Sequence, residues 1–314
     1  MSRRSHSSSS KSSPSPHESN MTQAGAETLV KGNIEEYARM MKKMVNNKEF
    51  SDLKFLIGPG RKAVYAHRCL LSARCAVFKA MFADKAGNVE KDVPLVLSDM
   101  SPEIFITMLE FIYTNCVTLS SKNAIDVLAT SLEYGLDDLR DLCVDYMEEN
   151  LTSTNACDVM QAAVTYNQND LKEKTMGFIE DNSGDVFKSK SFQEISEDTL
   201  VSILRSSRLS MDELELYRAV KEWATVNSVV NGRKVHEVAR EAVKHIRLPL
   251  LSAEELTGLE DESKKDSFMP VGSFAYAWKL HALKQGEKEN ILSIRRRGTS
   301  PRDHHKYLTD QNSK

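Results

Sequence analysis

Apolar positions follow two different patterns on either side of residue 150. Before it, apolar and other residues alternate at 53–57, a Gly-Pro-Gly turn follows at 58–60, and 63–66 reads as a return strand. A third short strand is expected at 94–97. Helical spacing is expected at 68–82, 102–113, 123–133 and 136–149. Few strands among several helices predict an α+β fold for this half.

A short helix is expected ahead of the hairpin, over 33–47. Asn33 and Glu36 have the spacing of a capping box, which satisfies free amide groups in a first helical turn. Apolar residues then recur every three to four positions and form one apolar stripe along the helix: Ile34, Tyr37, Met41 and Met44. Such a stripe packs either inside its own chain or against another molecule.

After residue 151 the strand signals disappear. Helices are expected at 154–165, 169–181, 196–205, 210–227, 234–245 and 273–284. Their short connections favour antiparallel packing. We identify no repeat of fixed period, so a solenoid is not expected. The second half therefore reads as all-α.

Composition and charge exclude several classes of protein. Of the 314 residues, 40% are hydrophobic and 28% charged, which suffices for a buried core and argues against global disorder. Net charge is −3, with both ends basic and the stretch between them acidic, so nucleic acid is not an expected partner. No apolar run is long enough for a membrane span or a signal peptide. We expect a cytoplasmic protein, with the nucleus as an alternative.

No catalytic or cofactor motif stands out. GxSxG, P-loop, GxGxxG and HExxH are all missing from the sequence. Cys69 and Cys75 lie near His67, but this spacing matches no common zinc pattern, and both thiols fall in an apolar helical pattern that favours inert, buried cysteines. We expect no enzyme, no cofactor and no metal.

Asp52, His67 and Arg68 form a candidate charged cluster. The hairpin brings the start of one strand near the end of the next, so Asp52 comes within reach of His67 or Arg68. One interpretation is a structural salt bridge inside a monomer. The other places the pair at a subunit boundary beside the helix at 33–47. Periodicity does not decide between them.

The basic C-terminal tail is a second candidate, here for regulation. Its residues are Arg295, Arg296, Arg297, Thr299 and Ser300, followed by Pro301. Three arginines beside two hydroxyls read as a nuclear-import signal, a phosphate-binding patch, a kinase site or a solvated charged tail. We expect residues 286–314 to be mostly disordered, like the Ser-rich segment 1–28.

Several motifs, in order, resemble a BTB/POZ domain. They are Phe50-Ser51-Asp52-Leu53, Tyr65-Ala66-His67-Arg68, Leu70-Leu71-Ser72, Phe78-Lys79-Ala80-Met81-Phe82, Phe111-Ile112-Tyr113-Thr114 and Tyr134-Gly135-Leu136. Residues 151–249 resemble the BACK domain that follows many BTB domains, on Phe178-Ile179, Phe192, Ile195-Ser196, Leu200 to Leu209 and Ala219 to Trp223. The chain is thus similar to an α+β BTB/POZ domain (29–150) followed by an all-α BACK helical domain (151–249). A helical extension (250–285) and the basic tail (286–314) complete the expected layout.

The resemblance implies a homodimer whose first helix packs across the two-fold axis. The implied interface contains Ile34, Tyr37, Met41, Met44, Asp52 and Arg68. An interface of this kind uses the same patch on both subunits. The Met-rich helix suits that role, although packing within one chain would use the same residues.

Many BTB–BACK proteins hold a substrate against cullin-3 in a ubiquitin ligase, and a hydrophobic-x-Glu motif in one loop helps to engage the cullin. The aligned loop residues here are Ala86, Gly87, Asn88, Val89 and Glu90. Its aligned triplet, 86–88, lacks both the large apolar anchor and the carboxylate. The resemblance therefore supports two functions: a cullin-3 substrate adaptor for an unidentified client, or a homodimeric scaffold that recruits partners without a ligase.

Overall fold

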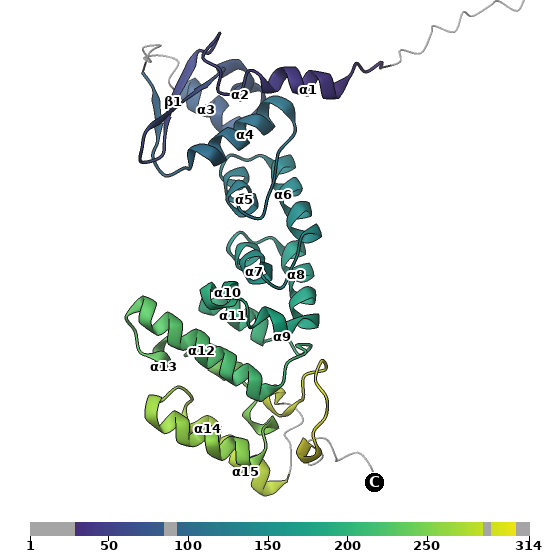
Figure 1. Ribbon diagram of the computed structural model, residues 1–314, viewed down its shortest axis with the longest axis vertical. Helices are drawn as coiled ribbons and strands as arrows, with labels where there is room; N and C mark the ends of the chain where they lie inside the picture. The colour runs from purple at the N-terminus through teal and green to yellow at the C-terminus, as the bar shows by residue number, and fades with distance from the viewer. Residues whose placement is uncertain (1–28, 85–92, 285–289, 306–314) are drawn as a thin grey trace, which may run out of the picture.

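The computed structural model describes residues 29–84, 93–284 and 290–305, and it is elongated (Figure 1). A sheet-containing unit forms one end, and helices stack away from it toward the other end. The first unit contains α1 (Ile34–Lys42), β1 (Leu53–Ile57), β2 (Lys62–Ala66), α2 (Arg68–Arg74), α3 (Ala76–Asp84), β3 (Leu95–Leu97), α4 (Pro102–Thr114), α5 (Ala124–Glu133) and α6 (Asp137–Glu149).

The three strands form one small sheet in the order β2-β1-β3. β1 pairs antiparallel with β2, with Leu53 opposite Ala66, and parallel with β3, with Phe55 opposite Leu95. Phe55 and Ile57 are fully buried and face the helices, which explains their alternation in sequence. All three expected strands and the hairpin turn are therefore present.

The single helix expected at 68–82 is two helices. Cys75 separates α2 from α3 with an extended backbone (φ −135°, ψ 117°), and its thiol donates to the carbonyl of Tyr134 at 3.3 Å. The break turns α3 so that Phe78 stacks on Phe82 and contacts Phe55 edge-on. Apolar spacing alone does not reveal this break, because the helices on both sides of it carry apolar residues at helical intervals.

The second unit is entirely helical. Its elements are α7 (Ala156–Thr165), α8 (Asn169–Asp181), α9 (Ser183–Val186), α10 (Lys190–Glu194), α11 (Glu197–Leu204), α12 (Glu213–Asn231), α13 (Val235–Val238), η1 (Ala242–His245), η2 (Leu248–Leu250), α14 (Ala253–Asp266), α15 (Val271–Leu283), η3 (Ile291–Ser293) and η4 (Asp303–His305). The expected helix at 234–245 is a short α13 followed by the 3₁₀ turn η1. The short helices α9 and α10 were not expected from apolar spacing, and neither was α14, which lies within the helical extension expected at 250–285.

Two consecutive helical hairpins repeat with an offset of 32 residues, contrary to our expectation of no repeat. α5 and α6 become α7 and α8 when 32 is added to each boundary. The capping bonds repeat as well: Asn123 accepts from the amide of Ser120 at 2.7 Å, and Asn155 from that of Thr152 at 2.8 Å. Two copies are too few for a solenoid signal, but they stack as one does (Figure 1).

Helix α7 joins the two hydrophobic cores. Val159 and Ala163 pack with the core of the sheet-containing unit, whereas Ala156 and Met160 pack with the second core. The two faces of α7 are therefore buried in different cores. The chain changes character at residue 151, but the two units pack continuously across that point. None of the described helices is both long and apolar enough to cross a membrane.

Candidate protein-interaction surfaces

Helix α1 is divided into a packed half and an exposed half. Met41 and Met44 pack against the core of the first unit, and the helix lies beside α4. Ile34 and Tyr37, in the first turn, are 65% and 61% exposed. In Figure 1 this end of α1 projects sideways from the body. The stripe seen in the sequence thus splits: its second half holds the helix in place, and its first half presents apolar surface to solvent.

The start of α1 is fixed as the sequence predicts, through half of the expected capping box. The Asn33 side chain accepts from the amide of Glu36 at 3.0 Å. Glu36 does not return the bond to Asn33 in the described structure; its carboxylate pairs with Arg39 one turn on. The cap therefore orders the exposed turn without help from the rest of the chain.

Asp52 contacts Arg68, but through the backbone. The Asp52 carboxylate accepts the amide N–H of Arg68 at 2.7 Å and so caps the first turn of α2. The Arg68 guanidinium instead lies 4.7 Å from the centre of the Phe82 ring. Asp52 and Arg68 thus lie together, as the hairpin predicts, but their side chains do not form a salt bridge with each other. Asp52 itself is exposed.

His67, next to this cap, is buried against Tyr113. The backbone N–H of His67 donates to the Tyr113 hydroxyl at 2.8 Å, and that hydroxyl lies 3.0 Å from His67 Nδ1. Burial raises the pKa of Tyr113 to about 12, so the hydroxyl keeps its proton. His67 Nε2 has no hydrogen-bond partner among the described residues. His67 has a structural role at this junction.

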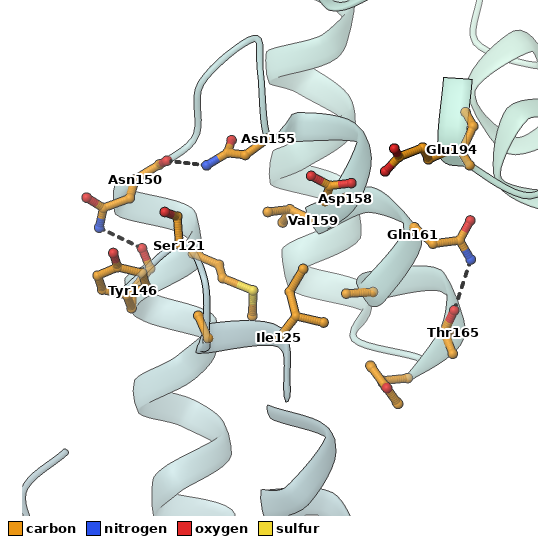
Figure 2. A pocket seen from close by; sticks show the side chains of 15 residues that line it. Ser121, Ile125, Tyr146, Asn150, Asn155, Asp158, Val159, Gln161, Thr165 and Glu194 are labelled. Carbon is orange, nitrogen blue, oxygen red and sulfur yellow. Dashed lines mark hydrogen bonds between the residues drawn. The ribbon is translucent and has the colours of Figure 1, made fainter. Parts of the chain in front are cut away.

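A groove of about 300 Å³ lies between the two repeated hairpins (Figure 2). Ile125 of α5 and Val159 of α7 line it, with Tyr146 at the end of α6. Bonds from Asn155 to the Asn150 carbonyl (2.9 Å) and from Asn150 to the Tyr146 carbonyl (2.8 Å) brace one end. Mixed apolar and amide lining of this kind suits a segment of polypeptide.

The polar wall of the groove carries an acidic pair. Asp158 faces Glu194, and burial followed by the Glu194 charge raises the pKa of Asp158. Gln161 spans the same wall: its amide donates to Thr165 at 3.0 Å and its carbonyl accepts from the Ser196 amide at 2.8 Å. The groove is thus acidic on one side and apolar on the other.

A second hollow, of about 490 Å³, lies between the β3–α4 connection and α5. Val96 on β3 is half exposed beside it, and Asp99, Asp126 and Glu133 contribute to its lining. The candidate cullin-contact residues Ala86 to Glu90 fall in the segment between α3 and β3 that lies outside the described residues.

The cysteines do not form a reactive or metal-binding centre. Cys75, Cys143 and Cys157 are buried, and burial raises the pKa of Cys143 and Cys157 to about 12. Cys69 is exposed, which corrects the expectation that it is buried with Cys75. Within 29–84, 93–284 and 290–305 no three His, Cys, Asp or Glu side chains are placed to hold a metal ion.

The basic tail differs most from expectation: residues 290–305 are folded against the second unit, where Figure 1 shows them in yellow. Arg296 is fully buried and its Nε donates to Glu213 at 2.6 Å. Arg295 is partly buried, Arg297 is exposed, Thr299 is partly buried with its hydroxyl on the Arg296 carbonyl (2.8 Å), and Ser300 is exposed. The three arginines therefore do not form one continuous solvated patch.

Further contacts hold the end of this segment. Arg302 pairs with Asp212 and with Glu255 (2.7 Å), the residues that cap α12 and α14. His304 and His305 both place Nε2 on the Leu250 carbonyl, at 2.8 and 2.7 Å. The sequence carries no signal for these pairings, because the partners lie about 50 to 90 residues apart.

Two protein families match this chain, and their matches meet between residues 151 and 156. The BTB/POZ domain family matches residues 41–151, and the BACK family (BTB And C-terminal Kelch) matches residues 156–260. BTB/POZ domain-containing protein 19 of Homo sapiens is 43% identical over 281 residues, which span 89% of this chain and 96% of that protein. The chain belongs to the BTB/POZ–BACK family.

Other relatives are more distant. The Bos taurus BTB/POZ domain-containing protein 19 is 42% identical over the same length, and BTB/POZ domain-containing protein 9 of Drosophila melanogaster is 29% identical over 69% of this chain and 29% of its own length. The BTB domain of zebrafish PATZ1 aligns over 39% of this chain and all of its own, at 17% identity and a TM-score of 0.31. BTB and BACK domains mediate binding to other proteins, so this chain is a protein-interaction module.

Proposed function

We propose that this BTB–BACK chain works as a homodimer and presents its BACK domain twice to partner proteins. The observation that carries the proposal is the exposed apolar turn of α1, with Ile34 and Tyr37 facing solvent beside a packed second half. An exposed apolar turn on a helix that is otherwise fixed in place can pack against the same turn of a second copy of the chain, which makes an isologous dimer contact. BTB domains generally self-associate, which agrees with this reading.

The test replaces Ile34 and Tyr37 with Glu and compares sedimentation of the full chain. Wild type is expected at twice the chain mass of 35.4 kDa. Loss of about 2–3 kcal/mol of apolar burial should weaken the dimer roughly 30- to 150-fold. A control places Glu at Val229 and Val230, which are 81% and 75% exposed at the end of α12, and it should leave the dimer intact. Equal masses for wild type and the α1 variant would reject this interface.

For the partner, we propose a cullin-3 adaptor role, with a ligase-free scaffold as the alternative. The groove between the α5–α6 and α7–α8 hairpins favours the adaptor, because it offers a contact region in addition to the altered loop sequence at 86–90. That loop favours the scaffold, since it lacks the apolar anchor and the carboxylate.

Calorimetric titration of the full chain with the N-terminal domain of cullin-3 separates the two. Binding at one cullin per protomer, lost on Ile125→Arg in the groove and kept in a Val229→Arg control, would support the adaptor. No heat from folded protein would support the scaffold. The client protein would then be sought on other surfaces.

A further inference from the structure

We propose that the BACK domain of this chain contains a peptide-binding site built around a guanidinium pocket, and that residues 290–305 (the C-terminal clasp) occupy it as a separable ligand. The ligand class is an extended segment with an arginine two residues before a glycine. The proposal concerns the far end of the molecule from α1 and does not depend on dimerisation.

The pocket supplies four hydrogen-bond acceptors to one arginine side chain. Arg296 Nε donates to the Glu213 carboxylate at 2.6 Å, and its two terminal nitrogens donate to the carbonyls of Leu204 (2.8 Å), Ser206 and His245 (3.0 Å). Every acceptor precedes Arg296 by more than 50 residues in the sequence. A planar fork with a carboxylate and carbonyls around it is selective for guanidinium over ammonium.

Arg247 belongs to the receptor side of the site. Its backbone N–H donates to the second Glu213 oxygen at 3.1 Å and thereby holds the carboxylate in place. Its guanidinium donates to the carbonyl of Ile294 in the clasp (2.6 Å) and to the Ser207 hydroxyl (2.9 Å). Burial and the neighbouring Arg296 lower the pKa of Arg247 to about 10, which leaves it charged. Arg247, on the receptor side, therefore binds the backbone of the clasp through the Ile294 carbonyl.

The clasp backbone lies directly on the loop at 204–209. The Arg297 amide donates to the Ser207 carbonyl at 2.6 Å. At Gly298 a side chain has no room, because an added Cβ would lie 2.7 Å from the Leu209 carbonyl oxygen. Only glycine allows the clasp backbone to lie this close to the loop at 204–209. Together with Arg296 it defines the Arg-x-Gly spacing of the ligand.

The clasp contributes almost no apolar packing. The buried hydrophobic cluster of this domain ends at Ala277, with Trp278 packed against it, and includes no residue of 290–305. Ile291 and Ile294 are about half exposed. The described contacts that hold the clasp are mainly hydrogen bonds and ion pairs, so its departure would expose the Glu213 carboxylate to water. A segment held mainly by polar contacts is able to leave and return as a peptide ligand does.

The experiment uses the full chain with a protease site inserted between residues 284 and 290. After cleavage, native mass spectrometry should find the clasp peptide still bound, one per chain. A labelled 290–305 peptide should then exchange into the site, as followed by anisotropy. Arg296→Ala and Arg296→Lys peptides should bind at least about 100-fold more weakly, since each leaves Glu213 without its fork. Gly298→Ala should bind at least about tenfold more weakly.

Arg297→Ala is the matched control, because this exposed arginine uses only its backbone N–H. It should bind within about threefold of wild type. Equal binding by the Arg296→Ala peptide would overturn the pocket. Unfolding of the chain on cleavage, seen by circular dichroism, would overturn separability and make the clasp part of the domain fold. A complex that holds two chains joined by exchanged clasps would support the site with the occupant supplied in trans.

Discussion

The two ends of this chain place their side chains in opposite ways. At α1 an apolar turn is exposed, whereas at the clasp an arginine is fully buried. Among the described residues no element covers Ile34 and Tyr37, while Arg296 has four hydrogen-bond acceptors around it. At these two places burial is decided by what the fold supplies around a residue and not by its hydrophobicity. The exposed end is where we expect a second molecule, and the buried end is where the chain supplies its own ligand.

The largest effect should follow from removing the carboxylate at the base of the clasp pocket. Glu213→Ala leaves two buried guanidiniums, those of Arg247 and Arg296, without a counter-charge in a closed site. Breaking a buried pair in this way costs about 3–5 kcal/mol of the free energy of unfolding. Urea denaturation of the full chain measures this loss. Glu215→Ala, exposed on the same helix, should lose less than about 1 kcal/mol, and equal losses would contradict the buried role.

A smaller effect concerns pH and the end of the clasp. His305 Nδ1 accepts the Arg302 amide at 3.2 Å while its Nε2 donates to Leu250, so only the neutral ring satisfies both bonds. Burial lowers the pKa of His305, opposed by the hydrogen bond to the Leu250 carbonyl, and the charges of His304 and Arg302 lower it further. Burial also lowers the pKa of His281, which stacks on His304.

The sign follows from these lowered values. Because the folded state binds a proton less readily than the unfolded one, the stabilisation is fully present above about pH 6.5 and is lost as pH falls below it. Urea midpoints at pH 7.5 and 5.5 should differ more for wild type than for His305→Gln. An identical pH dependence in both proteins would show that His305 does not contribute.

The smallest effect is expected at Asp52. Asp52→Ala removes the cap of α2 and should cost about 1 kcal/mol of the free energy of unfolding, read from a thermal melt. Asp52→Asn keeps an acceptor oxygen and removes the charge, so it should retain the cap. If the asparagine variant keeps its stability and its dimer mass, the charge of Asp52 has no role at the interface.

Much of the fold was predictable because local patterns determine it. The strand alternation at 53–57, the cap at Asn33 and the helices from 102 to 181 follow from spacing and turn residues. The break at Cys75 was missed because apolar spacing continues across it, and the contact made there, a thiol–carbonyl bond to Tyr134, is distant in sequence. The 32-residue repeat was missed because it has only two copies, although the motif Asn-Ala-x-Asp-Val at 123–127 recurs at 155–159.

The candidate sites were predictable only in part, for a related reason. The α1 stripe is a local pattern, and the sequence could indicate that it was apolar but not which half would pack. Arg295, Arg296 and Arg297 are equivalent in sequence, and only the arrangement of Glu213 and three carbonyls selects the middle one. Long-range polar complementarity of this kind leaves no periodic trace.

Hydrogen exchange of the full chain over a range of protein concentrations tests both ends in one measurement. If α1 is covered in a dimer, the amides of its first turn should exchange slowly at high protein concentration and faster on dilution. The amide of Tyr37, which donates to the Asn33 carbonyl, is one of them. The Arg297 amide, bonded to the Ser207 carbonyl, should stay protected at every concentration. Exchange at α1 that does not depend on concentration, or an unprotected Arg297 amide, would contradict these predictions.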